Sequence, residues 1–170
     1  MGMDKSQVGR AGELAVELYA LVTSAGELDI YSPVVDDDHV DLVAGIRGGP
    51  PTLGIQVKAT DNLDRAGLVE ARASYPIGRV RDDANFLYAV VLLQAVRIEA
   101  LWIMRSPDFN RLAYRNVNGG REVLEFRASP GRNDVFSTFR IDPMQLGPAL
   151  IARIAESPKP PKWLIALAKP

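Results

Sequence analysis

Apolar residues recur every three or four positions near the start of the chain, and in several later segments they form short runs. The early spacing puts Val8, Ala15 and Val22 on one face and predicts a helix over residues 8–24, with Gly26 as its stop. The later runs are short, and turn residues flank several of them, so they predict strands. These strands are expected at residues 28–35, 40–46, 53–60, 86–93 and 97–104.

The second half of the chain continues the mixture of helices and strands. The segment "NGG" separates two strand-like runs, residues 111–117 and 121–127, and predicts a hairpin. We further expect a short helix at 62–73, a strand at 134–141 and a closing helix at 143–156. A first helix, a series of strands with one helix between them and a last helix predict an α/β fold with a mixed β-sheet flanked by helices.

The last residues differ in composition from the rest. Residues 1–156 are expected to form one domain, whereas residues 157–170 form a proline-rich tail with an apolar end that includes Trp163 and Leu164. Its prolines prevent it from continuing the preceding helix. An apolar tail of this kind either packs back on its own domain or docks on a second subunit, which would give a homodimer.

The two strands at 40–46 and 53–60 are joined by the turn-rich segment "RGGPPT" and predict a hairpin. If Ile46 pairs with Leu53, then Asp41 lies opposite Lys58. Residues two apart on a strand share a face, and directly opposed residues do so as well. Asp41, Gln56 and Lys58 are therefore expected on one patch.

A carboxylate, an amide oxygen and a lysine on one patch suit the hydrolysis of phosphodiesters. Mg²⁺ prefers hard oxygen ligands, and Mn²⁺ is the alternative. Asp41 and the side-chain carbonyl of Gln56 are candidate ligands, with the main-chain carbonyl of Val57, and Lys58 is placed to hold the attacking water and offset charge on the phosphate. The competing interpretation is an ordinary ion pair between Asp41 and Lys58 on a solvent-facing strand.

A family resemblance supports the catalytic interpretation. Glu13 within "GRAGE", Asp41 within "HVDLVAG" and the segment "IQVK" with Gln56 and Lys58 resemble the PD-(D/E)XK nuclease superfamily. The resemblance is to the branch with an early helical glutamate, which includes archaeal Holliday junction resolvases and restriction-type endonucleases. It implies a restriction-endonuclease-like fold, a metal-dependent DNA-cleaving site, Asp41 as the shared metal ligand and Glu13 as an outer one.

The sequence departs from that family pattern at two positions. Val40 stands where the pattern has proline, and Gln56 replaces an acidic residue, so the site has one carboxylate fewer. Glu13 restores the charge count. On a helical wheel, however, Glu17 lies closer to the edge of the apolar stripe than Glu13, so helix geometry alone keeps Glu17 as a rival.

Four further residues are candidates for contact with substrate. Arg72, Arg79 and Arg81 occupy the polar stretch after the site, and guanidinium groups bind phosphate well. His39 shares the face of Asp41. A surface position is the simpler interpretation of each.

Charge and composition narrow the function classes. Residues 1–64 carry a net charge of −7 and residues 65–140 a net charge of +4, which suits a metal site beside a phosphate-binding surface. The chain has no cysteine and one histidine, which excludes disulfides, thiolate zinc sites and multi-histidine metal sites. It has no apolar run long enough for a membrane-spanning helix, so we expect a cytoplasmic protein.

The sequence thus predicts a metal-dependent endonuclease acting on DNA. The alternative is a non-catalytic domain that retains the nuclease scaffold for binding DNA or a protein. The Gln56 substitution and the modest net charge of −1 favour that alternative.

Overall fold

The computed structural model describes residues 3–33, 39–95, 97–157 and 159–167. Helices and strands follow one another in the order α1 (Lys5–Thr23), β1 (Leu28–Tyr31), β2 (Leu42–Ile46), β3 (Leu53–Thr60), β4 (Val69–Pro76), β5 (Phe86–Gln94), β6 (Arg97–Arg105), α2 (Ser106–Leu112), β7 (Tyr114–Asn118), β8 (Arg121–Ala128), β9 (Arg140–Ile141), α3 (Leu146–Ala155) and α4 (Lys162–Leu167). Short 3₁₀ helices at Ser137–Phe139 and Pro143–Gln145 precede β9 and α3.

The strands form two sheets. A six-stranded sheet has the order β1-β2-β3-β5-β6-β9, and a three-stranded sheet has the order β4-β8-β7. The pair β3–β5 is parallel and the other neighbours in the large sheet are antiparallel. The expected mixed sheet flanked by helices is therefore confirmed.

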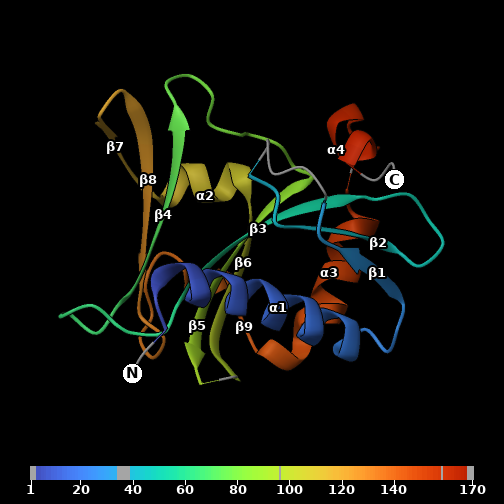
Figure 1. Cartoon of the computed structure of the whole chain (residues 1–170), viewed down its shortest axis with the longest axis horizontal. Helices are drawn as coiled ribbons and strands as arrows, with labels where there is room; N and C mark the ends of the chain where they lie inside the picture. Colours follow the sequence, from blue (N-terminus) through green and yellow to red (C-terminus); the bar gives the residue numbers. More distant parts are fainter. Residues whose placement is uncertain (1–2, 34–38, 96, 158, 168–170) are drawn as a thin grey trace.

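The large sheet has a hydrophobic core on each face. Helices α1 and α3 cover one face, where they pack on side chains such as Leu42, Ile55 and Ile103. The three-stranded sheet, α2 and α4 cover the other face, where the core includes Tyr88 and Trp102. Figure 1 shows α3 crossing the C-terminal half of α1, with β4, β7 and β8 grouped at the opposite side of the view from α4.

The sequence explains where helix α1 begins and which of its faces is buried. The side chain of Asp4 accepts a hydrogen bond from the Gln7 amide at 2.9 Å, and the Gln7 side chain accepts one from the Asp4 amide at 2.9 Å. This reciprocal cap satisfies two amides that would otherwise lack partners at the helix start. A stripe of buried residues, Val8, Gly12, Val16 and Ala20, then faces the sheet. The helix expected at 8–24 is confirmed and begins three residues earlier.

Two expected elements are wrong. Residues 62–73 do not form a helix, because the Asp64 side chain accepts hydrogen bonds from the amides of Ala66 and Leu68 and closes a turn. The chain then alternates inward and outward residues in β4, which pairs with β8. Residues 134–141 form mainly a 3₁₀ turn, and only Arg140–Ile141 pair as a strand.

The hairpin at "NGG" is confirmed, since Asn118 pairs with Arg121 around Gly119 and Gly120, both with positive φ. Its first strand begins later than expected, because α2 ends at Leu112. The strand expected at 28–35 ends at Tyr31, and residues 34 and 35 lie outside the described part.

The expected register of the β2–β3 hairpin is wrong by two residues. Leu42 pairs with Ile55 and Ala44 pairs with Leu53. Pro50 and Pro51 have no N–H to donate, so the ladder begins with the amide of Thr52, which donates to the Ala44 carbonyl at 2.9 Å. A shift of two residues preserves the faces, and Asp41 therefore projects on the same side as Gln56 and Lys58.

The tail packs back on its own domain. The Leu164 side chain is buried in the core, and the Trp163 ring lies over Gly54, where a Cβ atom would come within 2.8 Å of the ring. The Trp163 indole N–H donates to the Asp83 carboxylate at 2.8 Å. Because Gly54 has no side chain, the tail can pack directly against β3 at this position.

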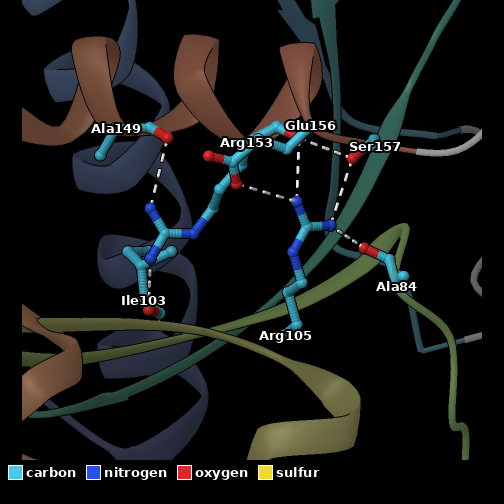
Figure 2. A network of polar contacts seen from close by, with 7 residues as sticks. All are labelled: Ala84, Ile103, Arg105, Ala149, Arg153, Glu156 and Ser157. Atoms are coloured by element: carbon cyan, nitrogen blue, oxygen red, sulfur yellow. Dashed lines mark hydrogen bonds and ion pairs between the residues drawn. The ribbon is translucent and has the colours of Figure 1, made fainter.

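Arg105 and Arg153 connect the end of α3 to the large sheet through hydrogen bonds (Figure 2). Arg105 donates to the Arg153 carbonyl at 3.0 Å and to the Ala84 carbonyl, while Arg153 donates to the Ile103 carbonyl at 2.9 Å. Burial, and then the Arg105 charge, lower the pKa of Arg153. The network holds the helix that precedes the tail.

Among the described residues, no helix combines the length and apolar character needed to cross a membrane.

Candidate functional site

Asp41 immediately precedes β2 and reaches across to β3. Its amide donates to the Ile55 carbonyl at 2.9 Å, and its carboxylate accepts a hydrogen bond from the Val57 amide at 2.6 Å. The carboxylate is therefore anchored beside the main chain that joins Gln56 to Lys58. A charge-assisted bond of this length holds an acidic side chain firmly.

The end of β3 extends past β2. Strand β2 pairs with β3 up to Ile55, whereas β5 pairs with β3 as far as Thr60. Lys58 therefore lies where β2 has ended, and its side chain is half-buried. This step in the sheet edge brings Asp41, the Val57 main chain and Lys58 together.

A cleft of about 720 Å³ opens at this end of β3. Residues 58–62 form one wall, and the start of α1 and residues 70–72 of β4 form the others. Its charge is mixed, because Lys5, Lys58 and Arg72 line it together with three acidic residues. One of those, Asp64, is paired with Arg127, and that hydrogen bond lowers the pKa of the Asp64 carboxyl.

Gln56 is buried, with 4% of its surface exposed, and it does not face solvent as an ordinary strand glutamine would. Its Oε1 accepts a hydrogen bond from the Tyr75 hydroxyl at 3.3 Å. The Tyr75 and Tyr88 hydroxyls lie 2.5 Å apart. Burial is the main cause that raises the pKa of both tyrosines, so both hydroxyls keep their protons.

Glu13 lies on α1, which covers the other face of the sheet from Gln56 and Lys58. Its neighbour Gly12 packs so tightly on β3 that a Cβ there would lie 2.3 Å from the Ala59 Cβ. Glu13 is thus next to the end of β3, and Glu17 lies one helical turn farther along. This contact favours Glu13 over Glu17. The Glu13 carboxylate pairs with Arg10 at 2.7 Å.

Two of the residues expected to contact substrate lie beside the tyrosines. The edge of the His39 ring contacts Tyr75, with the ring centroids 5.3 Å apart. The Arg81 guanidinium lies over the Trp163 ring at 4.3 Å and over the Phe86 ring at 4.9 Å. Arg81 is therefore packed under the tail, which restricts its reach toward a phosphate.

The other two arginines are exposed. Arg72 lines the cleft and pairs with Glu70 at 2.7 Å and Glu125 at 3.2 Å. Arg79 lies in the turn after β4, where its amide donates to the Pro76 carbonyl at 2.9 Å. Of the four residues, Arg72 is the one in the cleft with Lys58.

Comparison with solved structures identifies the fold. A bacterial homing endonuclease, I-Ssp6803I, superimposes with a TM-score of 0.58 over 92% of this chain and 100% of its own, at 16% sequence identity. The chain shares the fold of that structure. No family model and no curated protein sequence matches it. At this identity the likeness establishes the architecture and leaves the chemistry to the residues of this chain.

The oxygen atoms of the candidate site determine whether it suits the expected Mg²⁺ or Mn²⁺. Within the described residues, no group of three or more acidic or histidine side chains is arranged to hold a metal ion. Asp41, the amide oxygen of Gln56 and the Val57 carbonyl lie close together at β3, whereas Glu13 lies on α1 over the other face and pairs with Arg10. Mg²⁺ is often held by one or two carboxylates with water and phosphate in its remaining positions, so Asp41 with the two neutral oxygens fits, and Glu13 stays a predicted outer ligand.

Sequence reasoning missed Tyr75 and Tyr88. Tyr88 stands in the most apolar run of the chain, "FLYAVVLL", and faces Gln56 in the parallel register. A hydroxyl in a buried strand needs a partner, and this was the available signal. Tyr75 lies in none of the strands that the sequence predicts, so no alternation of faces places it toward the site.

Proposed function

We propose that the protein is a metal-dependent phosphodiester hydrolase of the PD-(D/E)XK type that cleaves DNA. The observation that carries the proposal is the Asp41 carboxylate, bonded at 2.6 Å to the Val57 amide between Gln56 and Lys58. The likeness in fold to a homing endonuclease supports it, and so does the position of Lys58, which lines an open cleft at the end of β3.

Each residue has a distinct role in this proposal. Asp41 holds the metal, with Gln56, Glu13 and the Val57 carbonyl as further oxygen donors. A bound Mg²⁺ or Mn²⁺ supplies Lewis-acid stabilisation of charge on the phosphate. Lys58 orients the attacking water and offsets negative charge as the phosphodiester is attacked. Arg72 contacts the DNA backbone at the rim of the cleft.

The test is cleavage of supercoiled, linear and branched DNA in Mg²⁺ or Mn²⁺. Asp41→Asn and Lys58→Ala are each expected to reduce cleavage by a factor of about 100 or more, since each removes charge at the reacting phosphate. The exposed Asp82→Asn and Lys159→Ala are matched controls that should retain wild-type activity. Equal cleavage by all five proteins would show that the nuclease lies elsewhere.

A second function is favoured by one observation. Position 56 has a neutral amide that already accepts a hydrogen bond from Tyr75, whereas the family pattern has a carboxylate there. A domain that binds DNA or a protein without cutting would retain the scaffold and tolerate this change. Calorimetry with Mn²⁺ separates the two, because a binding domain has no need of a metal whose affinity depends on Asp41.

A further inference from the structure

Two tyrosines from different sheets meet at Gln56. Tyr75 comes from β4 of the small sheet and is 3% exposed, and Tyr88 comes from β5 of the large sheet and is fully buried. Their hydroxyls lie 2.5 Å apart, and the Tyr75 hydroxyl donates to Gln56 Oε1 at 3.3 Å. The His39 ring packs edge-on against Tyr75 and fixes its plane. Gln56, on the large sheet, thus accepts a hydrogen bond from a side chain of the small sheet.

Counting hydrogens sets the direction of this chain of hydrogen bonds. Each hydroxyl has one hydrogen, and the amide oxygen can only accept. Tyr75 uses its hydrogen on Gln56, so the short contact between the hydroxyls requires the hydrogen of Tyr88. The chain therefore runs from Tyr88 to Tyr75 to Gln56.

The consequence is a defined orientation of the Gln56 amide. Its oxygen has two lone pairs, of which Tyr75 engages one. A metal held by Asp41 would use the second lone pair, and the bond from Tyr75 disfavours exchange of the oxygen with the NH₂ group. A buried amide without this bond would populate both orientations, and the flipped one would present N–H donors to a cation.

We propose that the Tyr75–Tyr88 pair is a positioning device that orients the Gln56 carbonyl oxygen for metal binding. This inference rests on the proposed function. Both tyrosines are positioning residues, since they act through Gln56. Hydrogen bonds from outside the ligand set typically change metal affinity about 10- to 100-fold when removed.

The decisive variant is Tyr75→Phe, which keeps the ring packing and removes the donor. We expect its Mn²⁺ dissociation constant, measured by calorimetry, to rise about 10- to 100-fold. Tyr88→Phe leaves the donor to Gln56 in place and should raise that constant less. Tyr114→Phe removes a hydroxyl from a residue that is 67% exposed and is the matched control, with no change expected.

Two readouts separate positioning from a general loss of packing. In the metal-free protein, the Gln56 side-chain NH₂ resonances, assigned by their loss in Gln56→Glu, should be sharp in wild type and broadened in Tyr75→Phe. In a Gln56→Glu background, Tyr75→Phe should leave metal affinity unchanged, because a carboxylate offers an oxygen in either orientation. A purely structural role would lower the affinity in both backgrounds.

The outcomes distinguish this inference from the function on which it rests. A wild-type protein that binds no Mn²⁺ and cuts no DNA would overturn the proposed function and this inference with it. A wild-type protein that does both, with unchanged metal affinity in a folded Tyr75→Phe, would overturn the positioning role alone. If Tyr75→Phe does not fold, the wild-type Gln56 NH₂ resonances decide: broad resonances in the metal-free protein would show that the amide is not held in one orientation and would overturn the positioning role.

Discussion

The two faces of the large sheet differ in what they bury. The face under α1 and α3 is packed with aliphatic side chains, whereas the face under the small sheet mixes aromatic rings with the hydroxyls of Tyr75 and Tyr88 and the amide of Gln56. Strand β3 serves both, since Ile55 and Val57 project to the first face and Gln56 and Lys58 to the second. The difference indicates that one face mainly stabilises the fold and the other also holds the candidate site.

The largest effect is expected on the aliphatic face. Ile55 is fully buried, and Ile55→Ala should lower the free energy of unfolding by about 2–5 kcal/mol, because it removes packed methyl groups and leaves a cavity. Chemical denaturation measures this loss. A loss below about 1 kcal/mol would contradict the division between the faces.

The second-largest loss of stability is expected from a change at the contact between α1 and β3. Gly12→Ala places a Cβ 2.3 Å from the Ala59 Cβ, so the helix must shift, at an expected cost of about 1–3 kcal/mol. The double variant with Ala59→Gly restores the space and should recover part of the loss. Absence of coupling between the two changes would show that the helix adjusts freely.

The hydroxyl-bearing face should respond to alkaline pH. Burial raises the pKa of Tyr88 well above its ordinary value of about 10, so the folded protein retains a proton that the unfolded chain releases. The stabilising contribution is present below pH 10 and is lost as the pH rises above it, by about 1.4 kcal/mol per pH unit. Urea denaturation between pH 9 and 11 should show a smaller decline in Tyr88→Phe than in wild type.

The smallest effect on stability is expected at the candidate catalytic lysine. Lys58→Ala, at a half-buried position, should change the free energy of unfolding by no more than about 0.5 kcal/mol while reducing cleavage strongly. Thermal unfolding and the DNA assay on the same preparation provide the comparison with Ile55→Ala. A large destabilisation would assign Lys58 a structural role.

Periodicity predicted the parts of the fold in which local pattern and tertiary structure agree. Helix α1, the strands β5 and β6 and the Asn118–Arg121 hairpin turn have one-sided or continuous apolar patterns and strong turn signals. The shared face of Asp41, Gln56 and Lys58 was predictable despite the wrong register. Side chains alternate between the two faces of a strand, so a shift of the pairing by two residues leaves each side chain on the same face.

The remaining features depend on partners that are distant in sequence. Residues 62–73 suited a helix locally, and their strand conformation depends on pairing with β8. The step at the end of β3 depends on two prolines that delay the ladder by two residues. The contact of Tyr75 with Gln56 requires both sheets to be assembled, so no local pattern could predict it.

The pairing of β4 with β8 also has a consequence for the time course of folding. Ala73 and Leu124 pair directly, yet 50 residues separate them along the chain. Local elements such as α1 and the β7–β8 hairpin form within microseconds, while pairings between distant segments must first overcome the entropy of closing a long loop. We expect the small sheet to close last, so that stopped-flow refolding would show the environment of Tyr75 maturing after the helices, and the candidate site would become competent only in that final phase.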